Sequence, residues 1–140
     1  AWTAEEVGIY GGEAYAEAPG RSEEAHVLGI ESDGGVFSPL GFGFSGSEEA
    51  FAMVREVGRM LDPIGAGSVT RGGGGADIGP MMRRGMPGMG LTVESTRYFW
   101  YHHTDADTLD KLKPAELARC VAALAVMAYV VADLPDPLPR

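Results

Sequence analysis

The chain has 140 residues, enough for one domain with a substantial hydrophobic core. Hydrophobic residues make up 45% of it, which excludes an intrinsically disordered chain. The formal net charge of −9 argues against a nucleic-acid partner, because the chain has few cations to neutralise phosphates.

The N-terminal segment carries two adjacent carboxylates. Residues 1–4 are expected to form the end of a strand, and Glu5 and Glu6 follow directly. Such residues are usually solvated, but at the end of a strand they can instead point into the crevice where open α/β sheets bind ligands. No initiator Met or signal peptide precedes them, so we expect the C-terminal part of a longer protein.

The next elements are a helix and a second strand that ends near an aspartate. Residues 13–18 favour a helix, which Pro19 ends. Residues 26–31 are typical of a short buried strand, and Asp33 follows it. An aspartate before two glycines is commonly an ordinary turn residue, but its place at a strand end also makes it a candidate ligand. His26 is expected to be a surface residue.

The middle of the chain alternates again between strand and helix. Residues 41–46 favour a strand, and Ser47 is a suitable N-cap for the helix that follows. The apolar stripe of this helix contains Phe51, Val54, Val57 and Leu61.

Residues 65–75 form a glycine-rich loop with a short strand at 68–70. Because no Gly-Lys-Ser/Thr follows, a mobile or closely packed loop is favoured over a phosphate site. Asp77 is expected to cap a short helix that ends near residue 83.

The segment at residues 98–108 is the richest in metal-ligand and acidic groups. It follows a strand expected at 88–93 and contains His102, His103, Asp105 and Asp107. Imidazole and carboxylate groups together suit zinc, and several carboxylates suit a two-metal site. The spacing matches no motif as specific as His-Glu-x-x-His, so a metal site is one hypothesis and a structural loop is the other. Serine catalysis is disfavoured, because no Gly-x-Ser-x-Gly elbow is present.

The last expected element is a long helix at residues 114–132, which begins with a proline. We place its buried stripe at Leu117, Val121, Leu124, Ala128 and Val131. The helix is apolar almost all round from Cys120 onward, so it should be deeply buried or lie against a partner. Its apolar run is too short to cross a bilayer, and we expect no membrane span. Cys120, the single cysteine, cannot form an intramolecular disulfide and is expected in the core.

The alternation of strands and helices predicts an α/β fold with a largely parallel sheet. Several short segments, in this order, also resemble those of a known family. They are Thr3-Ala-Glu-Glu6, Glu31-Ser-Asp-Gly34, Gly75-Ala-Asp-Ile78, Gly85-Met-Pro-Gly88, the segment from His102 to Thr108, and Tyr129-Val-Val-Ala-Asp133. The set resembles co-catalytic di-zinc exopeptidases, and within the zinc aminopeptidase family it is most similar to the carboxypeptidase Q (plasma glutamate carboxypeptidase) branch.

The resemblance implies a role for each matching residue. Glu5 would be the general base, Glu6 a ligand of one zinc ion, and Asp33 a ligand of the other. His103 would bind the same zinc ion as Glu6, and Asp77 and His102 would lie on the substrate side. The intact protein would hold two zinc ions, but the family's first zinc histidine and its bridging aspartate precede the Glu-Glu pair. The sites in this chain are therefore expected to be incomplete, and the chain alone is expected to be inactive.

The resemblance also implies a fold and a function. Residues 1–140 would be the C-terminal part of a single catalytic domain with a three-layer α/β/α fold and an incomplete sheet. The whole protein would hydrolyse short peptides as an aminopeptidase or dipeptidase, through a metal-bound hydroxide. Its partners would be a peptide substrate, the upstream part of the same domain and a second copy in a homodimer. Its location would be secreted or periplasmic. The alternative is a non-catalytic α/β domain that keeps the fold for binding or assembly.

Overall fold

An open four-stranded sheet lies at the centre of the computed structural model, which describes residues 2–20 and 26–140. The strands are β1 (Gly29–Glu31), β2 (Pro39–Ser45), β3 (Ser68–Arg71) and β4 (Gly88–Val93), in the spatial order β1-β4-β2-β3. The pairs β1–β4 and β2–β3 are parallel, and β2–β4 is antiparallel. The predicted α/β class is confirmed, with parallel pairing at both edges of the sheet.

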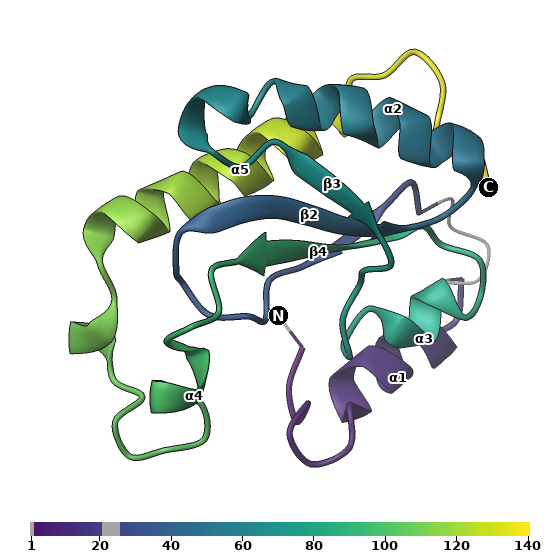
Figure 1. Cartoon of the computed structure of the whole chain (residues 1–140). Coiled ribbons are helices and arrows are strands. Elements are labelled where there is room, and N and C mark those ends of the chain that lie inside the picture. The colour runs from purple at the N-terminus through teal and green to yellow at the C-terminus, as the bar shows by residue number, and fades with distance from the viewer. Residues whose placement is uncertain (1, 21–25) are drawn as a thin grey trace.

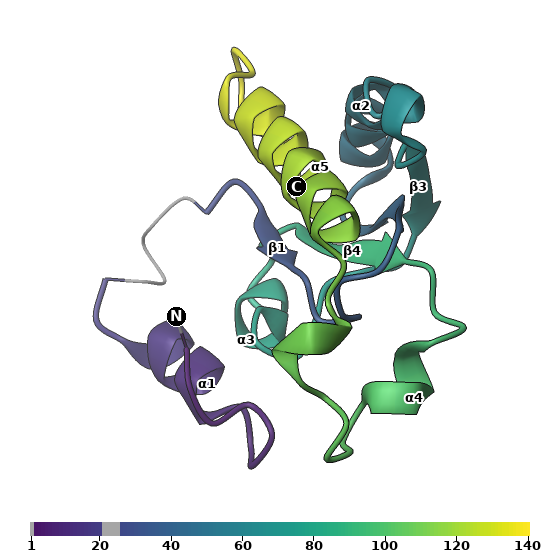
Figure 2. The ribbon, with the colours of Figure 1, turned by 90° about the vertical axis from the view of Figure 1, so that its left-hand side faces the viewer.

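Helices cover both faces of the sheet and give three layers. The helical elements are α1 (Tyr10–Glu17), α2 (Glu48–Arg59), η1 (Asp62–Ile64), α3 (Gly79–Met82), α4 (Tyr98–Tyr101), η2 (Leu109–Lys111) and α5 (Pro114–Ala132). Figure 1 shows α2 and α5 above the sheet, with α1 and α3 below it. The view at right angles in Figure 2 shows the same layers.

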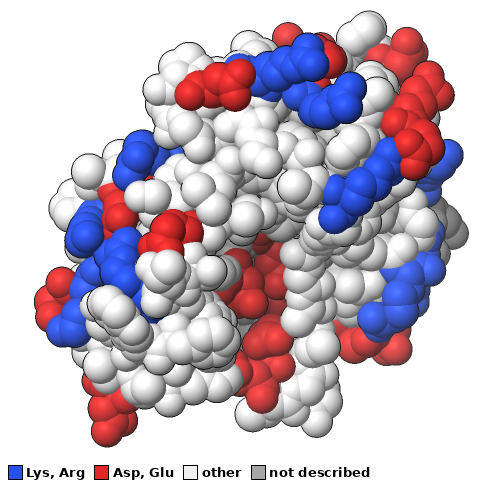
Figure 3. All heavy atoms as spheres, in the orientation of Figure 1, with Lys and Arg blue, Asp and Glu red and all other residues white. Residues whose placement is uncertain are grey.

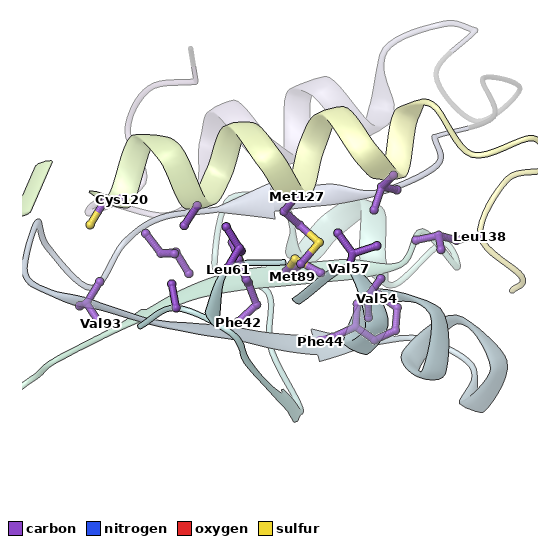
Figure 4. Packing of buried hydrophobic residues seen from close by; sticks show 14 of the residues in the cluster. Phe42, Phe44, Val54, Val57, Leu61, Met89, Val93, Cys120, Met127 and Leu138 are labelled. Carbon is purple, nitrogen blue, oxygen red and sulfur yellow. The ribbon is translucent and has the colours of Figure 1, made fainter. Parts of the chain in front are cut away.

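The main core lies between the sheet and the α2–α5 layer. Its most deeply buried large side chains are Phe42 and Phe44 from β2, Met89 from β4, Val54 from α2 and Met127 from α5. These side chains point toward one another across the interface (Figure 4). The burial of their apolar area is the main favourable contribution to folding. The core therefore ties the central strands to the two long helices.

Helix α2 begins where its sequence predicts. Ser47 is the N-cap, and its hydroxyl accepts a hydrogen bond from the Ala50 amide at 3.2 Å. The same hydroxyl donates to the carbonyl of Pro139 at 2.9 Å. Val54 and Leu61 are buried as expected of the predicted stripe. One serine thus caps the helix and fastens the C-terminal segment beside it.

The predicted bounds of α5 are confirmed, but its predicted buried stripe is only partly right: Val131 is buried and Leu124 packs against the core, whereas the other three residues are exposed. The buried side chains are those of Glu116, Cys120, Ala123, Met127 and Val131, whereas Leu117 is 42% exposed and Val121 is 55% exposed. A helix that is apolar nearly all round does not mark which face packs, so the sequence could not fix the rotation. Cys120 is a core residue as predicted, and burial raises the pKa of its thiol.

Among the described helices, α5 alone is long and apolar enough to cross a membrane by length and composition. Its buried stripe nevertheless packs on the sheet through Ala123 and Met127, and Glu116 is engaged in an ion pair with Arg97. One face of α5 thus packs as part of the core, while only 28% of its most apolar window is buried.

Further predictions about the elements and their residues are corrected. Residues 2–4 form no strand, because the carbonyl of Thr3 accepts a hydrogen bond from the Gly11 amide at the start of α1. Within residues 26–31 only Gly29–Glu31 is a strand, and α1 begins at Tyr10. His26 is half-buried, with its Nε2 atom 2.9 Å from the Tyr15 hydroxyl. Asp77 does not cap α3, since Ile78 is the N-cap residue and has no side-chain cap.

Candidate metal centre

The predicted site residues lie near one edge of the sheet, where β1 and β4 end. Because these strands are parallel, their carboxyl ends meet at the same edge. Asp33 follows β1, and His103 follows β4 by way of α4. The N-terminal turn brings Glu6 to this edge, where both carboxylate oxygens of Glu6 lie 3.1 Å from Nε2 of His103. The two residues are 97 positions apart in the sequence.

The cleft around these groups is both acidic and apolar. It has a volume of about 200 Å³. One part of its lining carries the charged and imidazole groups of Glu6, Asp33, His102, His103, Asp107 and Lys111. The other part is formed by Gly35, Val36, Phe37, Tyr98, Tyr101 and Leu112. Figure 3 shows Asp and Glu side chains gathered in a hollow on this face of the molecule. The arrangement suits a ligand with both polar and apolar parts.

A tight turn presents the Glu5–Glu6 pair. The carbonyl of Glu5 accepts hydrogen bonds from the amides of Gly8, at 3.1 Å, and Ile9, at 3.0 Å. The chain then enters α1, so the two carboxylates stand just before a helix. Glu6 is exposed and reaches His103, whereas Glu5 is half-buried. The turn therefore gives two adjacent glutamates different environments, as their predicted roles require.

Three residues other than glycine have a positive φ angle in the described part of the chain, and all three lie in segments that carry the site. Ala4 has φ 62° and Ile9 has φ 60°, so they bracket the turn that holds the two glutamates. His103 has φ 56°. Residues other than glycine rarely adopt this left-handed backbone conformation, which costs them on the order of 1 kcal/mol. Such strain concentrates at functional sites, where the surrounding structure maintains it.

The carboxylates of the cleft create a negative field. The pKa of Glu5 is raised first by desolvation and then by the negative charges of Glu6, Asp33, Asp77 and Glu31. Both effects disfavour the ionised form. Glu5 is thus easier to protonate than an ordinary glutamate.

The same negative charges also affect the phenol of Tyr98. Its pKa is raised by desolvation and by the negative charges of Asp33, Glu6 and Asp107. Tyr98 therefore remains a neutral hydroxyl on the wall of the cleft at neutral pH.

The donors in the cleft match zinc in chemistry. Zinc is bound by imidazole nitrogen and carboxylate oxygen, which are the groups that His103 and Glu6 bring together. Asp33 lines the same cleft and offers a further oxygen donor. Within residues 2–20 and 26–140, no three His, Cys, Asp or Glu side chains are grouped closely enough to hold a metal ion. The ligand roles of Glu6, Asp33 and His103 stay predictions.

The glycine-rich loop is packed closely against the sheet, in agreement with one of its two predicted forms. The Ser45 hydroxyl donates to the Gly73 carbonyl at 2.8 Å and accepts from the Gly73 amide at 3.0 Å. A Cβ atom at Gly73 would lie 1.9 Å from the carbonyl oxygen of Gly43, so only glycine fits there. The loop leads to Asp77, whose Oδ1 atom is buried without a hydrogen-bond partner among the described residues. A substrate-side role for Asp77 stays a prediction.

Two residues important to the site were not identified from the sequence. Glu31 accepts a hydrogen bond from the Ile78 amide at 3.0 Å and thereby holds the segment that carries Asp77. Tyr98 lines the cleft and stacks on His102 with ring centroids 4.5 Å apart. Tyr98 precedes His102 by four positions, and this helical spacing is a signal that the aromatic run contained.

Proteins similar to this chain are found both by sequence and by structure. The model of the family described as "Peptidase family M28" matches residues 1–128. Carboxypeptidase Q of Mus musculus is 38% identical over 139 residues, and that of Xenopus laevis is 40% identical over 139 residues. Each match covers 99% of this chain and 30% of the relative, so the chain spans about a third of the length of these curated relatives. The crystal structure of a Peptidase M28 precursor from Shewanella amazonensis SB2B superimposes with a TM-score of 0.89 at 32% identity, covering 99% of this chain and 32% of that chain.

Proposed function

Because the chain belongs to peptidase family M28, we propose that it is the part of a zinc-dependent exopeptidase that supplies Glu5 as general base and Glu6, Asp33 and His103 as zinc ligands. The whole protein would hydrolyse short peptides. The observation that carries the proposal is the contact between Glu6 and His103, which joins a zinc-type oxygen donor to a nitrogen donor across 97 positions of sequence. Asp33 faces the same cleft.

The residues of the cleft would divide the work of hydrolysis. Zinc, when bound, lowers the pKa of water and polarises a carbonyl group. Glu5 would accept the proton that the attacking water loses and then deliver it to the leaving amine, which requires a carboxyl group that is readily protonated. The raised pKa of Glu5 suits this exchange. Glu6 and His103 would hold one zinc ion, and Asp33 would be a ligand of the other.

The apolar lining of the cleft would bind a side chain of the substrate. Val36, Phe37, Tyr101 and Leu112 border the same space as the candidate ligands. A peptide whose scissile carbonyl faces Glu6 and His103 can therefore place an adjacent apolar side chain against these residues. We expect short peptides with an apolar residue beside the cleaved bond to be preferred substrates. Asp77 and His102 would lie on the substrate side.

Zinc binding tests the proposal directly. In the full-length protein, Glu6→Gln should lower zinc affinity by more than roughly 100-fold. Losing a residue that only orients a ligand costs about 10- to 100-fold, and here a ligand itself is weakened. Competition with a chelating indicator measures the affinity. Glu17→Gln changes an exposed glutamate of α1 and is the matched control, with unchanged affinity expected. Equal zinc affinity in the Glu6→Gln variant and the parent protein would remove Glu6 from the metal centre.

We also propose that the upstream part of the catalytic domain covers the outer edge of β1. A groove of about 330 Å³ runs along this edge, lined by His26, Val27, Leu28, Ile30, Ala128, Val131 and Ala132. Strand β1 is at the end of the sheet, so among the described residues no strand pairs with its outer backbone groups. The exposed apolar side chains of α5, including Val121 and Tyr129, extend the uncovered surface.

Hydrogen exchange tests this assignment. The amides of Gly29–Glu31 should exchange much more slowly in the full-length protein than in the isolated chain, because the upstream part would protect them. The amides of β2, paired on both sides, serve as the internal control. Equal exchange of the β1 amides in both proteins would contradict the proposal. Protection that depends on protein concentration would assign the edge to a homodimer instead.

A secreted or periplasmic location stays a prediction.

A further inference from the structure

The segment after β4 contains a stack of three rings that ends at His103. The rings of Tyr98 and His102 are 4.5 Å apart with an interplanar angle of 23°. Those of His102 and His103 are 3.8 Å apart with an interplanar angle of 24°. Phe99 meets Tyr98 at 5.0 Å and His102 at 6.0 Å, both edge-on. The middle ring, that of His102, is thus contacted by three others.

The backbone explains how two neighbouring histidines can stack. His102 is the C-cap of α4, and its amide donates to the Tyr98 carbonyl at 3.0 Å. His103 follows with φ 56°, at a position after a helix where glycine is usually found. In this left-handed conformation the His103 ring stacks on the ring of His102. The strained backbone and the ring stack therefore occur at the same residue.

The His103 side chain needs such support because it is otherwise exposed. Its side chain is 62% exposed, and that of Glu6 is 69% exposed. An exposed side chain samples several rotamers, and fixing it costs conformational entropy. The stack restricts the imidazole from one side, while Nε2 remains directed at Glu6 at 3.1 Å. Thr104 steadies the next turn, since its hydroxyl donates to the Tyr101 carbonyl at 2.7 Å.

We propose that His102 is a positioning residue, whose flat ring holds the imidazole of His103 in the orientation that binds zinc. The inference rests on the proposed function, in which His103 is a ligand. Partners that orient a ligand typically contribute about 10- to 100-fold to metal affinity. What matters here is the flat face of the His102 ring, so another flat ring should replace it.

Two variants of the full-length protein test this role. His102→Ala removes the ring and should lower zinc affinity by at least about 10-fold. His102→Phe restores a flat ring and should recover most of that affinity. Chelator competition measures the affinity, and NMR of the His103 ring should show a broader or shifted signal in His102→Ala and a parent-like signal in His102→Phe. Urea denaturation controls for a loss of folding.

The outcomes separate this inference from the proposed function. Unchanged affinity in His102→Ala, or an equal loss in His102→Phe, would overturn the positioning role. His103→Ala is the reference variant, and zinc affinity that survives it would overturn the proposed metal centre itself. A large loss of zinc affinity in His103→Ala with no loss in His102→Ala would agree with the proposed metal centre. It would show that the ring stack does not position His103.

Discussion

Glu5→Gln is expected to lower the kcat of the full-length protein for a short peptide by about 10²- to 10⁴-fold, the usual contribution of a general base. Glutamine has nearly the same shape but cannot accept a proton. Zinc content should stay the same, because Glu6 and His103 hold each other independently of the Glu5 carboxylate. Steady-state hydrolysis and metal analysis of one preparation measure both quantities.

The control for this substitution is Glu17→Gln, at an exposed position on α1. It removes one negative charge from the same part of the chain without touching the cleft. Its kcat should match that of the parent protein. Near-normal turnover in Glu5→Gln would remove Glu5 as the base, and a parallel loss of zinc would make it a ligand instead.

Arg97→Met is expected to destabilise the protein by about 3 kcal/mol or more, the usual cost of leaving one member of a buried ion pair alone. The Arg97 guanidinium donates to Oε1 of Glu116 at 2.7 Å, and their side chains are only 18% and 10% exposed. It also lies 4.7 Å from the ring centroid of Phe37. Oε2 of Glu116 already lacks a hydrogen-bond partner among the described residues, so the variant would isolate this carboxylate further. Urea unfolding measures the change.

Two comparisons test the cause. Arg59→Met breaks an ion pair with Glu56 whose side chains are 62% and 59% exposed, and it should cost less than about 1 kcal/mol. The double variant Arg97→Met with Glu116→Met should recover much of the lost stability, because it leaves no unpaired charge buried. Additive losses in the double variant would show that the two side chains stabilise the fold separately.

The ion pair also predicts how stability depends on pH. Burial alone would raise the pKa of Glu116, but the hydrogen bond and charge of Arg97, with Lys113 and Ser38, outweigh it and lower the pKa. A carboxyl group with a lowered folded-state pKa stabilises the fold above its unfolded pKa, about 4.3, and this contribution disappears as pH falls through the folded pKa. Arg97→Met should reverse the sign, since a lone buried carboxylate favours protonation. Unfolding free energies between pH 3 and 7 should show both trends.

Local sequence signals predicted the elements well and their orientation less well. Ser47 and Pro114 marked the starts of α2 and α5, because caps and helix-initiating residues act within a few positions. The rotation of α5 could not be predicted, since an apolar residue such as Val121 is as suitable for the core as Met127. Asp77 was expected to act as a cap, but its segment is instead held by the hydrogen bond between Ile78 and Glu31, which are 47 positions apart. Interactions at such separation leave no local pattern.

The same reasoning applies to the site. Residue chemistry identified Glu5, Glu6 and His103 as candidates, but nothing local indicated that Glu6 meets His103. The resemblance to zinc exopeptidases supplied that pairing, and the structure places the two side chains in contact. The stack of Tyr98 on His102 depends on α4 (Tyr98–Tyr101), a helical turn too short to be recognised from its sequence.

The hydrogen bond from the Ile78 amide to Glu31 has a consequence for the alignment of the sheet. Strand β1 pairs with β4 through only Gly29, Ile30 and Glu31, and so short a ladder tolerates slippage. A slip of one residue would turn Glu31 to the opposite face and move Asp33 along the edge by about 3.3 Å. The hydrogen bond of Glu31 therefore fixes the register of β1. It thereby also fixes the position of Asp33, which follows two residues later.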